Sequence, residues 1–385
     1  MNMNDYFDPV SLDKPDLHLL PENLLFCRYV DIHTPNIPIK NIENYDIAII
    51  GVPEEKNAFV PGSAKAPDRV RSKLYQLSSV NRKIRIIDLG NLKITDNIND
   101  TYYALRDITI ELRSKNVLVI FIGGSQDLTY GINMAFDKIR KRFTLCAIDA
   151  RLDFGTGGKK ISSITYLDHI LKSKKGSDYN FFNIGNQAYF THLKIIDRLE
   201  KQGHECIRLG EARRDISQIE PYLRDSGFVS IDMSCVRHSD APGVTIPSPN
   251  GFFGHELCQM ARYAGVAPGI EGIGIFELFP DIDMNEQTSH LAAQAIWYFI
   301  EGFSLKLLEK KDGTLHKKYH IHLQESGHEL VFYKSARTER WWMELPVINE
   351  ETGKNLMISC NYSDYQKACN HEIPDRWLKA YNRYS

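Results

Sequence analysis

Residues 228–234 read Phe-Val-Ser-Ile-Asp-Met-Ser, and they lead into a Pro- and Gly-rich segment that ends near Phe253. This profile predicts a buried strand whose carboxyl end opens into a loop. In parallel α/β sheets, ligands bind in crevices at such strand ends. An aspartate at that place, here Asp232, is costly to bury unless it meets a cation. The stretch therefore indicates an α/β sheet with a polar site at the carboxyl edge of its strands.

Two other predicted strands end in the same kind of segment. The apolar run 117–122 is followed at residues 123–127 by Gly-Gly-Ser-Gln-Asp. The run 144–148 is followed at residues 149–153 by Asp-Ala-Arg-Leu-Asp. Because the carboxyl ends of parallel strands meet at one edge of a sheet, we expect the three segments to direct their carboxylates toward one point.

The composition is that of an ordinary globular protein. The chain has 385 residues, of which 43% are hydrophobic and 25% are charged, and its length allows one large α/β domain or two smaller ones. The formal net charge is −2 and the pI is about 6.7. No overall field favours nucleic acid or an anionic membrane, so neither is expected as a partner.

The cysteines and the chain start indicate a reducing compartment. Seven cysteines are scattered without a Cys-x-x-Cys pair, which argues against a disulfide framework and against a cysteine zinc site. The first ten residues are polar and acidic, unlike a signal peptide. No apolar run reaches about 18 residues, so no membrane span is predicted. We expect a soluble cytoplasmic protein.

Predicted strands and helices alternate along the chain. The strands are expected at 46–50, 83–89, 116–122, 143–148, 181–185, 204–209, 227–231 and 272–279. The helices are expected at 68–77, 100–114, 129–139, 166–173, 192–202, 216–224, 255–264 and 290–308. This alternation predicts an α/β fold with a mainly parallel central sheet.

Composition divides the chain into three segments. Residues 1–45 are rich in Pro and Asp and are expected to wrap the surface, residues 46–310 form the α/β domain, and residues 311–385 form an aromatic-rich C-terminal extension with three of the four tryptophans. Strand-like alternation appears at 320–323 and 329–334. The extension is expected to pack either on the main domain or on a protein partner, and aromatic-rich tails more often serve packing than recognition.

A series of short motifs between about residues 46 and 308 carries a family resemblance. They occur in this order: Gly51-Val52-Pro53, Arg69-Val70-Arg71, Asp88-Leu89-Gly90-Asn91, Gly123-Gly124, Leu128-Thr129-Tyr130-Gly131, Asp149 with Asp153, Ile184-Gly185 with Gln187, Ser230 with Asp232, Ala241-Pro242-Gly243, and Glu277 with Pro280 and Asp283. With this order and spacing, the chain resembles the ureohydrolase (arginase/agmatinase) family, and most of all its formimidoylglutamase branch. The resemblance implies a three-layer arginase-like α/β fold.

The resemblance also implies a site with two manganese ions, which bridge and acidify a water that attacks a guanidinium or formimino carbon. Six side chains hold the ions in the family. Three of those positions remain here, namely Asp149, Asp153 and Asp232. The other three positions are substituted. Gln126 and Arg151 stand where the family has histidines, and Ser234 stands where it has an aspartate.

The substitutions affect the two implied metal sites unequally. The second site loses both ligands that it does not share with the first, since Arg151 is a permanent cation and the Ser234 hydroxyl is a weak neutral ligand. The first site keeps three carboxylates and exchanges a histidine for Gln126, whose carbonyl oxygen suits a hard ion. We therefore expect either no metal or one divalent ion (Mn²⁺, Mg²⁺ or Ca²⁺), and no two-manganese cluster.

Arg151 is the predicted internal cation of the cluster. Three converging carboxylates repel one another, and a guanidinium is suited to neutralise them. Arg151 is therefore expected where the second metal would lie. In the alternative, Arg151 points to solvent and Asp149 caps the next segment. Glu277 matches the family acid that binds the cationic group of the substrate, or it pairs with an internal arginine such as Arg151.

Two functions follow from this pattern. The first is a pseudoenzyme that has lost the two-manganese catalyst and acts as a binding or assembly protein, since no other nucleophile constellation is evident. The alternative is an active C–N hydrolase of the ureohydrolase class, acting on a formimino or guanidino substrate with a single or altered metal site. The retained carboxylates and Glu277 favour this alternative. The resemblance further implies a homo-oligomer.

Overall fold

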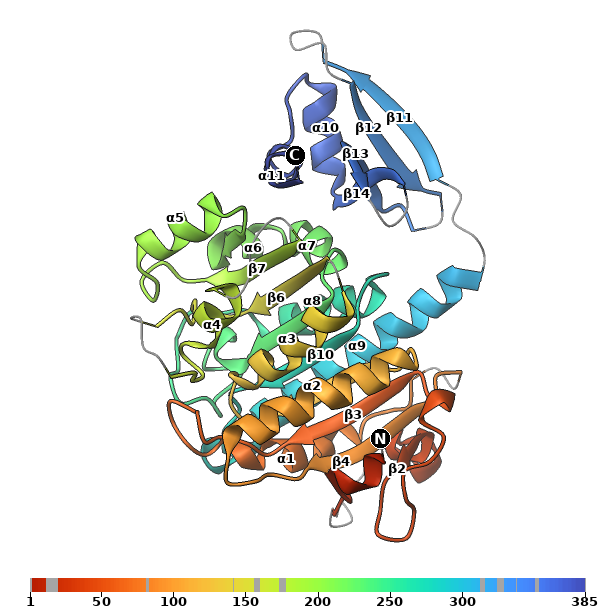
Figure 1. Ribbon diagram of the computed structural model, residues 1–385, viewed down its shortest axis with the longest axis vertical. Helices are drawn as coiled ribbons and strands as arrows, with labels where there is room; N and C mark the ends of the chain where they lie inside the picture. The colour runs from red at the N-terminus through yellow and green to blue at the C-terminus, as the bar shows by residue number, and fades with distance from the viewer. Residues whose placement is uncertain are drawn as a thin grey trace.

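The computed structural model describes residues 2–11, 20–80, 83–140, 142–155, 160–172, 178–311, 316–323, 329–336, 338–349 and 353–384. Its elements form a large α/β domain and a smaller C-terminal domain, which lies at one end of the molecule over α6 and α7 (Figure 1). None of the described helices is long and apolar enough to cross a membrane.

The main domain is built on a ten-stranded sheet in the order β1-β4-β3-β5-β10-β9-β6-β7-β8, with β2 also paired to β4. The strands are β1 (Phe7–Asp8), β2 (Val30–Ile32), β3 (Ile47–Val52), β4 (Ile86–Leu92), β5 (Leu118–Gly123), β6 (Phe143–Ile148), β7 (Tyr179–Asn186), β8 (Glu205–Arg208), β9 (Phe228–Asp232) and β10 (Gly272–Phe276). Only β1 pairs in an antiparallel sense. The predicted mainly parallel sheet is confirmed.

Helices cover both faces of the sheet, which explains why the central strands read as continuous apolar runs rather than as alternating ones. All six residues of β5 are buried. One core cluster contains side chains from α1 (Ala66–Leu74), α6 (Leu209–Arg214), α7 (Glu220–Arg224), α8 (Gly254–Val266) and α9 (Gln287–Lys311). The other contains side chains from α2 (Ile98–Ser114), α3 (Leu128–Ile139), α4 (Tyr166–Lys172) and α5 (Leu193–Lys201). The result is the expected three-layer α/β architecture.

The N-terminal segment contributes two strands that the sequence pattern does not predict. The two-residue strand β1 pairs with β4 on the edge of the main sheet, and the three-residue strand β2 pairs with β4 as well. Strands this short carry no readable alternation. Part of residues 1–45 therefore extends the sheet, and the boundaries of the three predicted segments stay predictions.

The C-terminal domain is a four-stranded antiparallel sheet in the order β11-β12-β13-β14. The strands are β11 (His316–His322), β12 (Glu329–Ser335), β13 (Trp341–Asn349) and β14 (Lys354–Cys360), and they are followed by α10 (Tyr362–Cys369) and α11 (Asp375–Tyr384). Trp341, Trp377 and Phe332 lie in a separate core cluster. The aromatic residues of the extension thus build a core of their own.

Arginines of α11 join the C-terminal domain to the main domain. Arg376 donates to Asp225 Oδ2 at 2.6 Å and to the Ser359 carbonyl at 2.7 Å. Arg383 donates to the carbonyls of Tyr179, at 2.5 Å, and Gly203. The extension therefore packs on the main domain through buried polar contacts, as one of the two sequence-based interpretations expects.

His204 makes this junction sensitive to acid. Burial, followed by the charge of Arg383, lowers the pKa of His204 to about 3, whereas an unfolded histidine titrates near 6.5. Between these two pKa values His204 is protonated in the unfolded chain and neutral in the folded chain. The free energy of unfolding therefore falls as the pH drops from about 6.5 toward 3. For one such group, the loss between about pH 7 and pH 5 amounts to about 2 kcal/mol.

His204→Gln is expected to remove this part of the acid sensitivity, because glutamine is neutral in both states and keeps an acceptor for Arg383. The free energy of unfolding, measured by urea titration between pH 7 and pH 5, should decline less steeply than in wild type. His255→Gln, which removes an exposed histidine of α8, serves as control. Equal slopes for His204→Gln and wild type would show that His204 does not contribute.

Candidate metal centre

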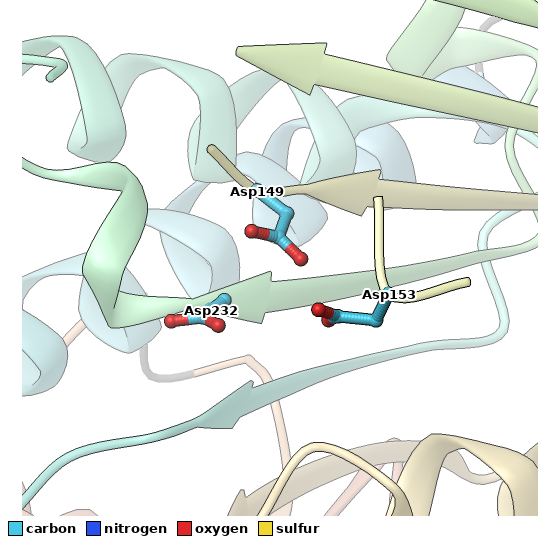
Figure 2. Close-up of side chains that lie close together, drawn as sticks. All are labelled: Asp149, Asp153 and Asp232. Carbon is cyan, nitrogen blue, oxygen red and sulfur yellow. The ribbon is translucent and has the colours of Figure 1, made fainter. Parts of the chain in front are cut away.

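Three buried carboxylates meet at the carboxyl edge of the main sheet. Asp149 directly follows β6, Asp153 lies four residues further on, and Asp232 is the last residue of the neighbouring strand β9. Their ligand atoms all lie within 4.8 Å of one another, and Figure 2 shows the three side chains converging from these segments. The strand-end pattern thus predicted the meeting of carboxylates from two of the three segments, whereas Asp127 of the third segment accepts from Tyr102 and Ser125 instead.

Burial makes this cluster electrostatically costly. It raises the pKa of Asp149 to about 7, and the charge of Asp232 adds to the effect. Burial, followed by the charges of Asp149 and Asp232, raises the pKa of Asp153 well above its usual range. Burial also raises the pKa of Asp232. Buried carboxylates with raised pKa values favour the uptake of protons or of a cation.

Gln126 reaches into the cluster from the loop after β5. Its side-chain Oε1 and Nε2 both find hydrogen-bond partners in only one orientation of the amide. We assign that orientation from the hydrogen-bond pattern. In that orientation Nε2 donates to Asp153 Oδ2 and to Asp232 Oδ2, each at 3.2 Å, and Oε1 accepts from the Tyr166 hydroxyl at 3.2 Å. The side-chain amide therefore links two of the carboxylates directly.

Arg151 lies beside the cluster and contacts the position of the substituted second ligand. Its Nη1 donates to Ser234 Oγ at 3.3 Å, and its guanidinium lies 4.3 Å from the ring centroid of Phe190. Its charge lowers the pKa of Asp149 and of Asp232, but less than burial raises each. Within the described chain it forms no ion pair with the three carboxylates, so its role as internal cation remains a prediction.

The backbone N–H of Arg151 supports the interpretation in which Asp149 caps the next segment. The Arg151 N–H donates to Asp149 Oδ1 at 2.8 Å, so Asp149 does cap the segment that follows it. Similarly, the Ser234 N–H donates to Asp232 Oδ1 at 2.6 Å. Each of these carboxylates is held by the chain two residues downstream, which fixes its remaining oxygen toward the cluster.

Glu277 follows β10 and has a left-handed backbone with φ 59°, a costly conformation for a residue other than glycine. Its carboxylate accepts from the Gln126 N–H at 2.9 Å, and its own N–H donates to the Gly124 carbonyl at 3.0 Å. Burial, followed by the charge of Asp232, raises the pKa of Glu277 well above its usual range. Among the described residues Glu277 forms no ion pair with Arg151, and its carboxylate accepts from the Gln126 N–H, so the alternative pairing with Arg151 stays a prediction.

A second buried network lies behind the cluster and was not predicted. Asp127 accepts from the Tyr102 hydroxyl and from Ser125 Oγ, both at 2.5 Å, and Asn57 donates to Tyr102 at 2.8 Å. Burial raises the pKa of Asp127. Tyr102 belongs to α2 and Asn57 to the loop after β3, so no local pattern in the sequence links them. This network anchors the loop that carries Gln126.

The cavity above the carboxylates is small. Its volume is about 30 Å³, which is room for one or two water molecules or an ion. Polar residues of the cluster form one wall. Apolar side chains form the others, and these are Phe59, Val60, Ile164, Val244, Ile246 and Phe279. A substrate the size of agmatine or formimidoylglutamate would extend beyond this volume.

The residues fit one metal ion better than two. Divalent ions bind protein oxygens at about 2.0–2.6 Å, so oxygens around one ion lie no more than about 4–5 Å apart, and the ligand atoms of the three carboxylates lie within 4.8 Å of one another. A flipped Gln126 amide would add a carbonyl oxygen. At the second position, Ser234 Oγ is the acceptor of an arginine hydrogen bond, and an arginine cannot be a ligand. The donor set there does not fit a metal.

A parallel sheet covered on both faces, with a buried carboxylate cluster at its carboxyl edge, defines a three-layer α/β protein with a candidate metal site. A family model described as the arginase family matches residues 45–301, which is more than half of the chain. The chain therefore belongs to the arginase family.

Curated relatives and solved structures agree with this assignment. The formimidoylglutamase of Staphylococcus haemolyticus is 23% identical over 288 residues, covering 70% of this chain and 92% of the relative. That of Bacillus subtilis is 23% identical over 279 residues, covering 67% and 87%.

Among solved structures, formiminoglutamase of Trypanosoma cruzi with Mn²⁺ superposes with a TM-score of 0.63 at 21% identity, covering 69% of this chain and 96% of that one. Formimidoylglutamase from Bacillus subtilis gives a TM-score of 0.64 at 20% identity, covering 77% of this chain and 95% of that one. These similarities establish the arginase-like fold of the main domain.

Proposed function

We propose that this arginase-family chain has lost the two-manganese catalyst and acts as a binding or assembly protein. The observation that carries the proposal is the cavity of about 30 Å³ above the carboxylates, walled by Phe59 and Phe279. A hydrolase of the family's substrates needs room for a guanidino or formimino compound beside its nucleophile, and these walls fill that room.

The chemistry of the second metal position supports the same proposal. A pair of bridged metal ions supplies a hydroxide at neutral pH and stabilises the charge that develops on the substrate. Here Arg151 and Ser234 take the place of two ligands and bond to each other. A single ion at the first position would acidify water less than two bridging ions.

A single divalent ion remains part of the proposal as a structural cofactor. Asp149, Asp153 and Asp232 would hold it together with Gln126, and Mn²⁺, Mg²⁺ and Ca²⁺ all accept such oxygen ligands. Its charge would offset the repulsion among the buried carboxylates. In its absence, the Nε2 group of Gln126 links Asp153 to Asp232, which gives the site a metal-free arrangement. Arg151 adds positive charge nearby in both cases.

The alternative is an active C–N hydrolase on a formimino or guanidino substrate with a single or altered metal site. The strained backbone of Glu277 favours this function, because strain of this kind accumulates at functional sites. The relatives named formimidoylglutamase favour it as well. It would require the walls of the cavity to move apart when the substrate binds.

An activity assay distinguishes the two functions. Wild-type protein supplied with manganese is expected to show no hydrolysis of formimidoylglutamate, agmatine or arginine above the protein-free rate. Asp232→Ala is the control, because it removes a carboxylate of the proposed metal site. Hydrolysis by wild type that disappears in Asp232→Ala would overturn the proposal and establish the alternative.

We further propose a homo-oligomer in a reducing, cytoplasmic compartment, with the C-terminal domain as a possible contact for a protein partner. All seven cysteines are free, which supports the compartment. Phe59 and Tyr189 are 60% and 64% exposed, and such exposed aromatic side chains suit contacts between subunits. Light scattering on the purified protein tests the oligomer, and a monomer at micromolar concentration would refute it.

A further inference from the structure

A groove of about 770 Å³ runs between the main domain and the C-terminal domain. Residues that precede or begin the parallel strands line one side of it. Examples are Arg142, which directly precedes β6, and Phe143, the first residue of β6. Helix α11 and strand β14 line the other side. The groove therefore lies at the amino ends of the strands, whereas the carboxylate cluster lies at their carboxyl ends.

Basic side chains of α11 face this groove. Arg376, Lys379 and Arg383 all line it, and their spacing of three and four residues places them on one side of the helix. Arg142 approaches from the main domain, and its guanidinium lies 5.4 Å from the ring centroid of Tyr384. The Arg383 guanidinium lies 6.0 Å from the same ring. The two cations therefore flank one aromatic side chain at the junction.

Several guanidinium nitrogens of this groove are buried but lack hydrogen-bond partners among the described residues. They are Arg142 Nη1, Arg376 Nη1 and Arg383 Nε. Arg376 Nη1 reaches Glu205 only at 3.8 Å. A buried charged donor that is left unsatisfied carries a substantial energetic cost, so an added acceptor at these nitrogens would be stabilising.

The lining of the groove is also rich in basic side chains. Seven Lys and Arg residues line it, together with five Asp and Glu residues. Both carbonyl acceptors of Arg383 are neutral backbone groups, so no carboxylate compensates its charge directly. Glu205 is shared between Arg376 and Lys379. Burial accordingly lowers the pKa of Arg383.

We propose that this groove binds a small molecule carrying a dianionic phosphate group, with Arg142 and Arg383 as its principal donors. Guanidinium groups are well suited to donate to phosphate oxygens, and Arg142 and Arg383 each keep one nitrogen without a hydrogen-bond partner among the described residues. The volume lies within the range of about 300–1,000 Å³ found for small-molecule sites, which often occur between domains. Phe143, Phe182 and Tyr384 offer apolar surface to the rest of the molecule.

This site is independent of the proposed loss of hydrolysis. If the chain is a binding protein, the groove supplies its ligand; if it is an active hydrolase, the groove is an effector site remote from the carboxylates. In both cases the ligand would contact both domains and stabilise their association, because it binds the folded arrangement only.

The test uses the full-length protein with inorganic phosphate as the probe, in isothermal titration calorimetry at low ionic strength. Wild type is expected to bind one phosphate per chain, and phosphate should raise its melting temperature. Arg142→Gln should weaken binding about 10–100-fold, since it removes one charged donor. This variant is expected to fold, because within the described residues the ion-pair partner of Arg142 is the half-exposed Asp178, at 3.3 Å.

A matched control separates a built site from general charge attraction. Arg69→Gln removes one positive charge from α1, where Arg69 has a side chain 58% exposed, and it should bind phosphate as wild type does. Three results would overturn the proposal: no saturable binding in the millimolar range, equal binding by wild type and Arg142→Gln, or equal weakening in Arg69→Gln. An uncharged substitution at the second donor, Arg383→Gln, should reproduce the loss seen with Arg142→Gln.

Discussion

The triple variant Gln126→His, Arg151→His and Ser234→Asp is expected to bind two equivalents of manganese per chain, where wild type binds at most one. The three changes restore two imidazole nitrogens and a carboxylate at positions that adjoin the retained Asp149, Asp153 and Asp232. They also remove a permanent cation from the second site. Mass spectrometry of desalted protein, after incubation with manganese, gives the stoichiometry directly.

Partial restorations provide the controls for this experiment. Gln126→His alone changes only the first site and should not add a second equivalent, and Ser234→Asp alone leaves Arg151 in place and should not either. Hydrolysis is not expected even from the triple variant, because Phe59, Ile164 and Phe279 still wall the cavity. If the triple variant binds no more manganese than wild type, the assignment of the three substituted ligand positions is wrong.

Arg376→Ala is expected to destabilise the C-terminal domain by about 3–5 kcal/mol, the cost typical of removing one partner from a buried ion pair. Arg376 is 8% exposed. It donates to Asp225 and to the Ser359 and Pro221 carbonyls, and its loss leaves Asp225 without its buried cation. Urea unfolding followed by tryptophan fluorescence reports on this domain, which contains three of the four tryptophans.

An exposed ion pair of the same domain is the matched control for Arg376. Lys367 pairs with Asp375 at 3.1 Å, with side chains 45% and 81% exposed. Lys367→Ala should cost no more than about 1 kcal/mol, as exposed pairs usually do. If Arg376→Ala and Lys367→Ala prove equally mild, the C-terminal domain does not depend on its buried contacts with the main domain.

Much of the fold was predictable because the main sheet is buried on both faces. Strands such as β5, β6 and β9 appear in the sequence as short, continuous apolar runs, each closed by Gly or Asp. The elements that the sequence did not predict have different physical origins. β1 and β2 are too short to show a pattern, and β13 and β14 belong to a small sheet whose order depends on distant pairing rather than on local composition.

The candidate site was predictable only in its local parts. Asp149, Asp153 and Asp232 follow strands directly, so their meeting point follows from the topology. The contact of Gln126 with Tyr166 joins a loop to a helix that is distant in the sequence, and no local sequence pattern predicts it. The backbone conformation of Glu277 sets the direction of its carboxylate, which accepts from the Gln126 N–H. The closure of the cavity by Phe59 and Phe279 likewise depends on loops that are far apart in the sequence.

The groove at the opposite edge of the sheet adds a second reason to regard the chain as a binding protein. The C-terminal domain supplies Arg376, Lys379 and Arg383 to it, and this domain lies beyond the part of the chain that the arginase family model matches. The extension therefore brings positive charge to the amino ends of the strands.

The manganese content of the wild-type protein tests the loss of the two-metal catalyst most directly. Protein purified with manganese supplied, then desalted, is analysed by mass spectrometry for metal per chain. We predict at most one equivalent, bound by Asp149, Asp153, Asp232 and Gln126. Two equivalents per chain would contradict the loss of the second site, and would mean that residues other than Arg151 and Ser234 complete it.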